Sequence, residues 1–388
     1  MNILEEIQNC PVEWKELGEV VDTVTSPVKL TKKEYQVTGR IPIVDQGEQF
    51  VAGYTDNEKY LEKDEYIIFG DHSEHIKYVD FAFVQGADGL KILKPKSGIK
   101  AKYIYYCFCN FYKKEGSYKR HWSKARTTQI PIPQSEEIQE KIVQILDKFT
   151  DYVTELTSEL TSELTSRKKQ YSFYRDTLLS FEDEVYQVEW KTLGEVAKFN
   201  YGYTDKAKDI GDVRFIRITD IDENGYLKPY DKKYIALTEA SRSYLVKYGD
   251  LLMARTGATF GKTLFIDTDE TSAYASFLIK ITPSEKLNSR YYWHFSKSEL
   301  YWKQANNLVS KAGQPQFNAN SLKNVKIPVP SLEIQSRIVQ VLDNFDTVCN
   351  DLNIGLPKEI ELRQKQYEYF REKLLTFVAE GEYTESRV

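Results

Sequence analysis

"IPIPQSEEIQEKIVQILDKF" at residues 130–149 returns as "IPVPSLEIQSRIVQVLDNF" at residues 327–345. From that match onward Ile138 aligns with Ile334 and Phe181 with Phe377, without a gap between them. An earlier pair, "VEWKELGEV" at 12–20 and "VEWKTLGEV" at 188–196, precedes the two copies. The chain is therefore a tandem duplication in which a mixed segment and a helical segment are each present twice.

The segments after Ile-Pro-x-Pro are expected to be long helices. Their apolar residues alternate at spacings of three and four, which is the heptad pattern of a coiled coil. Proline disfavours helix before it and tolerates the first turn, so it separates each helix from the preceding domain. We expect the two seams to pack against each other, and the alternative is that each helix packs only on its own domain. The seam residues are Ile138, Ile142, Ile145, Phe149, Tyr152, Leu156, Leu160 and Leu164 in the first copy, and Ile334, Ile338, Val341, Phe345, Val348 and Leu352 in the second.

Within the first helical segment, "ELTSELTSELTS" at 155–166 is one four-residue unit present three times. Four helical residues add about 6 Å of rise and about 400° of rotation, so a copy lengthens the helix while its apolar stripe drifts by only about 40°. The aligned stretch of the second segment, "DLNIGLPKEIEL" at 351–362, contains Gly355 and Pro357, which predict the end of one helix and the start of another. Whether the spacer is kinked there stays open.

The fold class expected is mixed α/β, or α+β. Domains at 1–133 and 182–330 would alternate with helical segments at 134–181 and 331–388. Residues 64–93 and 249–281 share a rhythm of short β-rich runs and turns. Aligning residues 66–69 with 251–254 places Gly70-Asp71-His72 opposite Arg255-Thr256-Gly257. Polar side chains that differ at the end of a common strand are typical of a ligand-reading surface.

The formal net charge of −5 is unevenly distributed. The acidic excess falls in the two helical segments, whereas residues 95–126 hold nine Lys/Arg against one Glu, interleaved with aromatic residues. That stretch predicts a surface that faces phosphates, and a solvated lysine-rich helix face is the alternative. No apolar run long enough for a membrane span and no signal peptide is found, so a cytoplasmic protein is expected. The four cysteines are expected to be structural thiols and no metal site is expected.

Motifs of catalysis are missing from the sequence. "GATFGKT" at 257–263 has three residues between its glycines where a phosphate-binding loop needs four. Asp220 and Asp222 in "RITDIDENG" are expected to shape a turn. We expect no catalytic residue and no cofactor bound by this chain, and interpret it as a binding protein.

The candidate DNA contacts are chosen by side-chain chemistry, because arginine forks and amides read base edges and lysine binds phosphates. A plain polar loop is the alternative for the amide-rich stretch 311–322. In the first domain the candidates are Asp71, His72, Ser73, Lys119, Arg120, His121, Lys124 and Arg126; in the second they are Tyr203, Asp205, Lys206, Arg217, Arg255, Thr256, Lys262, Lys311, Gln314, Gln316, Asn318 and Asn320.

Taken together, the duplicated plan, Ile-Pro-x-Pro before long helices, "RQKQYEYFREKLLTF", "ARTGATFGK" and "GQPQFNAN" resemble the specificity subunit of type I restriction–modification enzymes. The likeness covers essentially the whole chain. It implies that two target recognition domains read the two halves of a split, asymmetric site in double-stranded DNA. The helices would form an antiparallel coiled-coil spacer and dock two methyltransferase subunits, and restriction subunits would join through the complex.

The resemblance also implies that S-adenosylmethionine, ATP and Mg²⁺ bind to partner subunits, where adenine is methylated. The repeat number at 155–166 would then set the gap between the half-sites, with a plain solvated helix as the alternative. A free-standing methyltransferase or nuclease with duplicated domains is the alternative function. It would need a cofactor or metal site of its own.

Overall fold

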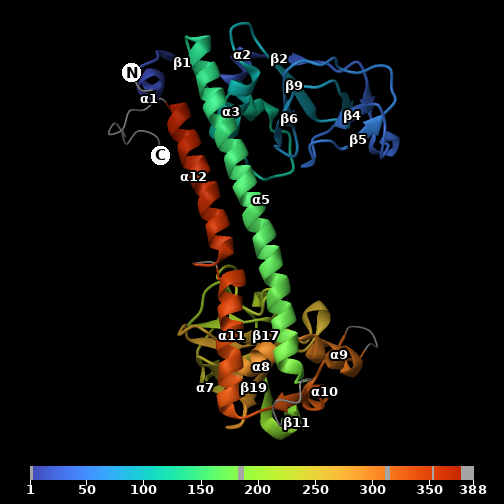
Figure 1. Cartoon of the computed structure of the whole chain (residues 1–388), viewed down its shortest axis with the longest axis vertical. Helices are drawn as coiled ribbons and strands as arrows, with labels where there is room; N and C mark the ends of the chain where they lie inside the picture. Colours follow the sequence, from blue (N-terminus) through green and yellow to red (C-terminus); the bar gives the residue numbers. More distant parts are fainter. Residues whose placement is uncertain (1–2, 182–187, 311–314, 352–353, 377–388) are drawn as a thin grey trace. The chain divides into compact units, whose positions relative to one another are not determined.

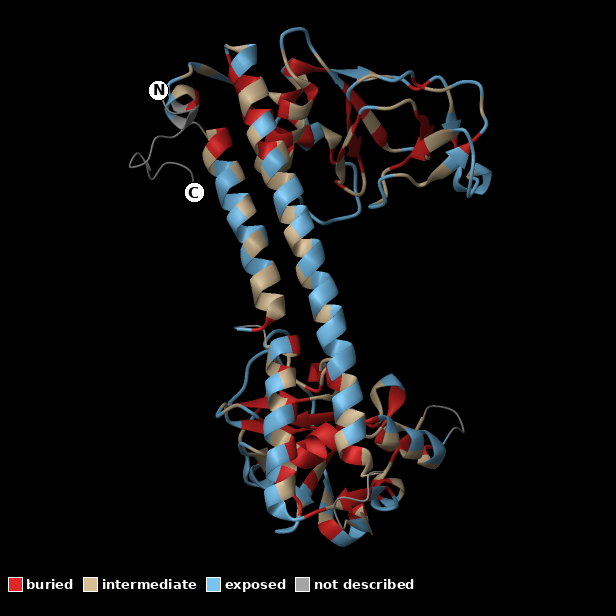
Figure 2. Cartoon of the chain, in the orientation of Figure 1, coloured by how far each residue is buried: buried red, intermediate tan, exposed pale blue. Residues whose placement is uncertain are grey.

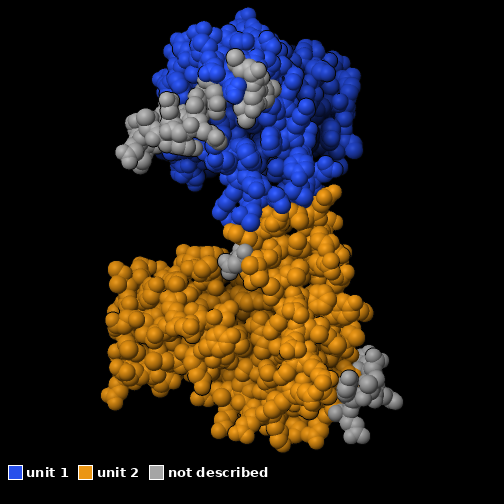
Figure 3. Space-filling model, turned by 60° about the vertical axis from the view of Figure 1, so that its left-hand side comes forward, with its two compact units in different colours: residues 1–158, 361–388 blue, residues 159–360 orange. Residues whose placement is uncertain are grey.

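The computed structural model describes residues 3–181, 188–310, 315–351 and 354–376. The chain divides into two compact units, residues 1–158 with 361–388 (unit 1) and residues 159–360 (unit 2), coloured separately in Figure 3. Each unit contains one mixed α/β domain together with parts of the long helices. Buried residues concentrate in the sheets and the helices packed on them, as Figure 2 shows.

The domain of unit 1 contains two four-stranded sheets and a two-stranded ribbon. The first sheet has the order β2-β9-β6-β7 and is antiparallel, and the second has the order β3-β8-β4-β5 with parallel pairs around β8. The ribbon joins β1 to β10, which is the first Ile-Pro-x-Pro segment. The strands are β1 (Val12–Glu16), β2 (Val21–Val24), β3 (Lys29–Leu30), β4 (Ile41–Val44), β5 (Gly53–Thr55), β6 (Tyr66–Gly70), β7 (Ile76–Val79), β8 (Val84–Gly86), β9 (Leu90–Pro95) and β10 (Gln129–Pro133).

The domain of unit 2 repeats this plan. Its sheets have the orders β12-β19-β16-β17 and β14-β13-β18-β15, and β11 pairs with β20, the second Ile-Pro-x-Pro segment. Proline is tolerated there because a two-stranded ribbon leaves one side of each strand without a hydrogen-bonding neighbour. The strands are β11 (Glu189–Thr192), β12 (Ala197–Tyr201), β13 (Val213–Ile216), β14 (Tyr234–Ile235), β15 (Leu245–Val246), β16 (Leu251–Ala254), β17 (Thr263–Phe265), β18 (Ser272–Tyr274), β19 (Leu278–Pro283) and β20 (Lys326–Val329).

The helices complete both domains, and the three longest of them are easily followed in Figure 1. Among the described residues, no helix combines the length and the apolar character of a membrane span. The helices of unit 1 are α1 (Ile3–Gln8), α2 (Leu17–Val20), α3 (Ala101–Phe111), α4 (Trp122–Ala125) and a 3-10 turn η1 (Lys32–Glu34). Those of unit 2 are α6 (Leu193–Val196), α7 (Glu239–Arg242), α8 (Ser289–Phe295), α9 (Glu299–Leu308), α10 (Ala319–Lys323), η2 (Ile218–Asp220) and η3 (Gly257–Thr259). The long helices are α5 (Glu136–Ser180), α11 (Leu332–Asn350) and α12 (Leu356–Thr376).

The strand register corrects our alignment of the two domains by one residue. Ile67 pairs with Leu93 on β9, and Leu251 pairs with Ile281 on β19, so Ile67 and Leu251 are equivalent. Asp71, rather than Gly70, therefore lies opposite Arg255. The backbone agrees, because Asp71 N–H donates to the Gly89 carbonyl as Arg255 N–H does to that of Phe277. The error arose because "YIIF" and "LLMA" contain no residue that marks the register.

A buried glutamine joins each domain to its long helix. Gln139 of α5 is 1% exposed; its Oε1 accepts from Lys100 N–H at 2.9 Å, and its Nε2 donates to the carbonyls of Gly98 and Pro133. Gln335 of α11 is fully buried and makes the same three bonds, from Asn288 N–H and to Lys286 and Pro330. Each amide thus ties the start of α3 or α8 and the end of the Ile-Pro-x-Pro strand to one turn of a long helix.

An aspartate further along each helix makes a second repeated contact. Asp147 accepts from Lys102 Nζ at 2.8 Å and from Tyr106 Oη at 2.6 Å. Asp343 accepts from Arg290 Nε at 2.8 Å and from His294 Nε2 at 2.7 Å. Burial lowers the pKa of His294 to about 4, against the opposing effect of Asp343. The imidazole is therefore neutral at pH 7, with the proton on Nε2 toward Asp343 and with Nδ1 accepting from Tyr171 Oη.

In unit 1, α5 and α12 pack antiparallel to each other. The ring of Phe149 stacks on Phe370 at 5.5 Å, and Thr150 Oγ1 lies 2.9 Å from Tyr367 Oη. The buried seam residues Ile138 and Ile142 share a core with α3 and with Leu374 and Leu375 of α12. Ile145 packs at the edge of the same core.

In unit 2, α11 packs against the last turns of α5. The ring of Phe345 stacks on Tyr174 at 5.2 Å, and Ile338 and Leu342 share a core with Tyr171 and Leu179. Ile334 and Leu164 lie at the edge of that core. The second helical segment is interrupted as predicted, since α11 ends at Asn350 and α12 begins at Leu356.

The expected antiparallel pairing of the two helical segments is confirmed, but the two seams do not face each other directly. The contacts above place Phe149 against α12 and Phe345 against the end of α5, so each seam faces the part of the other segment that lies outside its seam. Tyr152, Val341 and Val348 are exposed, at 61%, 43% and 41%. Leu156 and Leu160 are half-buried, and Leu352 lies outside the described residues. A heptad pattern identifies an apolar face but not the surface that covers it.

We expect Gln335→Ala to lower the free energy of unfolding of unit 2 by about 2–4 kcal/mol, because it leaves the Asn288 N–H and the carbonyls of Lys286 and Pro330 without this partner. Gln139→Ala should have a similar effect on unit 1. Gln144→Ala is the matched control, since Gln144 is exposed and bonds only Glu140. Urea unfolding of the full chain measures all three; an effect of Gln335→Ala no larger than that of Gln144→Ala would show that the joint contributes nothing.

Candidate nucleic-acid interface

In unit 2, the end of β16 presents an arginine between two aromatic rings. The guanidinium of Arg255 lies 5.3 Å from the ring of Tyr201 and 5.5 Å from that of Phe277, and Nε donates to the Ser276 carbonyl at 3.0 Å. Tyr201 and Phe277 are 47% and 52% exposed. Within the described part of the chain, no hydrogen bond or ion pair engages the two terminal nitrogens of Arg255. The rings and the carbonyl thus hold an arginine fork that is free to bind a ligand.

Residues 316 and 317 of the amide-rich stretch lie directly against the end of β16. Phe317 N–H donates to the Arg255 carbonyl at 2.8 Å, and Gln316 Nε2 donates to Thr256 Oγ1 at 2.9 Å. Thr256 is 3% exposed, so its hydroxyl serves this contact and not the surface. The structure therefore brings Gln316 to Arg255 and Thr256, although 60 residues separate it from Thr256 in the sequence.

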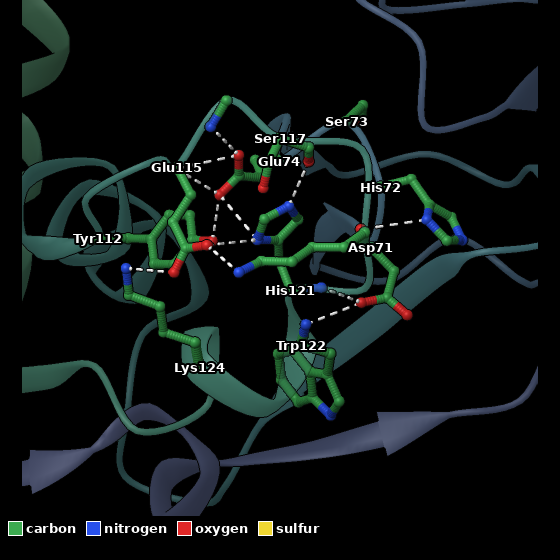
Figure 4. A network of polar contacts seen from close by, with 12 residues as sticks. Asp71, His72, Ser73, Glu74, Tyr112, Glu115, Ser117, His121, Trp122 and Lys124 are labelled. Atoms are coloured by element: carbon green, nitrogen blue, oxygen red, sulfur yellow. Dashed lines mark hydrogen bonds and ion pairs between the residues drawn. The ribbon is translucent and has the colours of Figure 1, made fainter.

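In unit 1, the equivalent strand end is followed by the loop 71–75, which contacts the loop 113–121 (Figure 4). Asp71 is 5% exposed and accepts from the N–H groups of His121 and Trp122 at 2.9 and 2.8 Å. The ring of His72 stacks on Tyr118 with centroids 5.2 Å apart, and its Nδ1 lies 3.1 Å from the Lys119 carbonyl. The two loops form one surface that exposes Tyr118, Lys119 and Arg120.

One buried and one exposed carboxylate lie next to this basic surface. Glu74 is 2% exposed, and burial raises its pKa, but hydrogen bonds from Tyr112 and from the amides of Glu115 and Gly116 outweigh burial and lower it. Hydrogen bonds from Lys119 and then Lys124 lower the pKa of Glu115 to about 2. Both carboxylates are therefore ionised at neutral pH, one inside the loop and one at its surface.

Other predicted contacts turn out to have structural partners. His121 is 1% exposed, Ser73 Oγ donates to the Gln46 carbonyl, and Arg217 is paired with Asp220 at 2.6 Å. Asn318 caps α10 by accepting from Ser321 N–H, and the ring of Tyr203 packs on Tyr244. Asp220 and Asp222 accept from nearby backbone amides, which confirms that they shape turns.

The remaining candidates are spread over the surface or lie elsewhere. Asp205, Lys206, Asn320 and Lys124 are exposed, whereas Lys262 is half-buried in a cavity that Asp222 also lines. The backbone carbonyl of Arg126 accepts from Gly18 N–H of α2. Lys311 and Gln314 lie outside the described residues.

Sequence reasoning missed Tyr118, Glu74 and Gln46 in unit 1, and Tyr201 and Phe277 in unit 2. The missed aromatic residues read as core, and Glu74 carries the wrong charge for a DNA surface. One signal was available, since Tyr118 lies inside the basic stretch 95–126 and Tyr201 begins "YGYTDK". Among the described residues, no group of three or more His, Cys, Asp or Glu side chains is placed to hold a metal ion.

Residues 11–166 and 187–362 each match the family described as the type I restriction modification DNA specificity domain. The chain belongs to this family. It is 35% identical to the EcoR124I/EcoR124II specificity subunit of Escherichia coli, with 97% of each chain covered. It is also 32% identical to a putative specificity subunit of Haemophilus influenzae, over 96% of this chain and 97% of the relative.

Solved structures of this kind share the fold. One chain from a study of the assembly of a type I R-M system superposes with a TM-score of 0.63 at 16% identity, covering 95% of this chain and 98% of that one. The S subunit of a type I system from M. genitalium superposes with a TM-score of 0.50 at 15% identity, over 95% and 96% of the two chains. The chain is thus a DNA-recognition subunit of a type I restriction–modification system and not its catalytic component.

Proposed function

We propose that each domain reads one half of a bipartite, asymmetric site in double-stranded DNA through the loops that follow β6 and β16. The observation that carries this proposal is the equivalence of Asp71 and Arg255. The two strand ends share register and backbone hydrogen bonds, yet one supports an aromatic and basic loop and the other an arginine fork. A common frame with different side chains is what two independent readers of different sequences require.

In unit 2, the reading group is Arg255 with Gln316 beside it. An arginine fork matches guanine O6 and N7, and an amide matches adenine N6 and N7. The rings of Tyr201 and Phe277 restrict the arginine, which reduces the side-chain entropy lost when it binds. In unit 1, the exposed Lys119 and Arg120 would bind phosphate or bases beside Tyr118.

The helical segments would dock two methyltransferase subunits, and restriction subunits would join the complex through them. Exposed carboxylates on α5, at Glu155, Glu159 and Glu163, suit protein partners better than DNA. S-adenosylmethionine, ATP and Mg²⁺ would bind to those partners, which would methylate adenine and cleave DNA. The complex would act on cytoplasmic DNA.

We expect Arg255→Ala to weaken discrimination at one base pair of one half-site by about 1–3 kcal/mol, because it removes a bidentate base contact. Sequencing of methylated positions, in DNA exposed to the assembled complex, measures the effect in both half-sites. Lys206→Ala is the control, since Lys206 is an exposed cation and its loss should weaken all sequences alike. A uniform loss with Arg255→Ala would mark this residue as a phosphate contact instead.

We expect the isolated chain to bind no S-adenosylmethionine, whereas the chain assembled with its methyltransferase subunits binds it. Isothermal titration of both preparations makes the comparison. Stoichiometric binding by the isolated chain would favour a free-standing methyltransferase. It would contradict the proposal that S-adenosylmethionine binds to the methyltransferase subunits.

We expect deletion of residues 157–160 to shorten the recognised gap by about one to two base pairs, because one repeat contributes about 6 Å of helix against about 3.4 Å per base pair. Leu156, Leu160 and Leu164 are half-buried while Glu155, Ser158 and Glu159 are exposed, so removing four residues nearly keeps the apolar face. A double substitution of equal length, Ser158→Ala with Glu159→Gln, should leave the gap unchanged. An unchanged gap after the deletion would refute this role of the repeat.

A further inference from the structure

The loop 113–121 of unit 1 is exposed and yet held at several points. Residues 113–120 are all exposed and lie outside any helix or strand between α3 and α4. A free loop of this kind loses backbone entropy when it binds, because every residue that becomes fixed gives up conformational freedom. Contacts that fix it beforehand remove that cost from binding.

Glu74 fixes the first part of the loop. Its carboxylate accepts from Tyr112 Oη at 2.6 Å, from Glu115 N–H at 2.9 Å and from Gly116 N–H at 2.8 Å. The ring of His121 closes the group, with Nδ1 3.4 Å from Glu74 Oε1. Figure 4 shows the carboxylate in the middle of these donors.

The backbone at Glu74 confirms that this placement is enforced. Its φ of 56° lies in the left-handed region, which is strained for a residue with a Cβ. Such a conformation persists only where the surroundings over-determine it, and here three hydrogen bonds do so. The Glu74 N–H also donates to the Gly70 carbonyl at 2.8 Å, which ties the turn to the end of β6.

Asp71 fixes the end of the same loop. Its carboxylate accepts from the N–H groups of His121 and Trp122, and its carbonyl accepts from His121 N–H as well. His121 Nε2 lies 2.7 Å from the Ser117 carbonyl, so the middle of the loop is fastened from within. Both anchors belong to the four residues that follow β6.

The fixed loop presents an aromatic stack. Tyr118 is 90% exposed, and its ring lies on that of His72 with an interplanar angle of 21°. Lys119 and Arg120 flank it, and both are exposed. A large apolar ring at the tip of a basic loop has no folding role to account for its exposure, and flat apolar groups contact thymine methyls or base steps in DNA grooves.

We propose that Glu74 is the positioning residue of the first recognition domain, holding loop 113–121 so that the Tyr118–His72 stack makes a specificity contact in a DNA groove. This inference rests on the proposed function, because it requires the loop to face DNA. Glu74 acts through the loop and touches no DNA itself.

The test replaces Glu74 by glutamine in the full chain assembled with its methyltransferase subunits. The amide keeps the size of the side chain but turns an NH₂ group toward the backbone donors. We expect affinity for the cognate site to fall about tenfold or more, with affinity for unrelated DNA changed less than about threefold, since only preorganisation is lost. Trypsin should then cleave faster at Lys113, Lys114, Lys119 or Arg120.

Glu115→Gln is the matched control. It removes an equal charge from loop 113–121 itself, where the Glu115 carboxylate pairs with Lys119 and Lys124 at the surface and lies 3.8 Å from His121 Nδ1. We expect unchanged discrimination, unchanged trypsin sensitivity and equal or tighter binding to all DNA. Equal losses of discrimination in Glu74→Gln and Glu115→Gln would overturn the positioning role.

Two variants of Tyr118 separate contact from positioning. Tyr118→Ala should lose discrimination in the first half-site, while its trypsin sensitivity stays as in the wild type. Tyr118→Phe keeps the ring and should retain this discrimination. Should Glu74→Gln fail to fold, Tyr112→Phe removes one of the bonds to Glu74 and should produce a smaller loss in the same direction. Wild-type discrimination in Tyr118→Ala and in the folded Glu74 or Tyr112 variant overturns the inference.

Failure of this inference is distinguishable from failure of the proposed function. If Arg255→Ala alters one half-site while the Glu74 and Tyr118 variants read both normally, the proposed function stands and the positioning role is wrong. If neither Arg255→Ala nor Tyr118→Ala changes any base preference, the strand-end loops do not read the DNA. The proposed function and the positioning role of Glu74 are then both wrong.

Discussion

The buried glutamine near the start of α5 and of α11 is the contact on which both units depend. A buried primary amide must satisfy its donors and its acceptor, and Gln139 and Gln335 do so with three backbone groups each. Those groups belong to the residues just before α3 or α8 and to the last proline of the Ile-Pro-x-Pro segment. Rotating the long helix about its axis by one residue would move the amide away from these hydrogen-bonding partners. With Asp147 or Asp343 two turns further on, the rotation and the height of each domain on its helix are fixed.

That fixed joint allows the rest of each domain to vary. β6 and β16 keep one register, and both make the same backbone bonds to the strand beside them and to the segment before α4 or α10. Asp71 and Arg255 nevertheless do opposite things from the same position. Asp71 turns inward to hold the backbone of the neighbouring loop, whereas Arg255 turns toward two exposed rings. A rigid strand end constrains where a side chain starts and leaves its chemistry free.

The repeat, the long helices and their break at Gly355 were predictable because each leaves a periodic or stereochemical mark in the sequence. A Cβ on Gly355 would lie 2.6 Å from the Asp351 carbonyl oxygen, so glycine is required there. The partners of the seams were not predictable, since a heptad pattern around Phe149 and Phe345 is silent about what covers it. The glutamine joint was also missed, because glutamine in a polar helix reads as surface. Its recurrence at the same repeat position was the one signal that could have revealed it.

The candidate contacts show a similar division. Side-chain type selected Arg255 and Gln316, which the structure places at one strand end, but it also selected His121 and Arg217, whose partners lie within the protein. Counting charge along the sequence treats Glu74 as an obstacle to DNA. In the structure its charge is taken up by one hydroxyl and two amide hydrogens, and the basic side chains face outward. The two domains therefore restrict their exposed groups in different ways. One uses buried carboxylates that grip a backbone, the other uses aromatic rings that hold a cation, and only the three-dimensional arrangement distinguishes them.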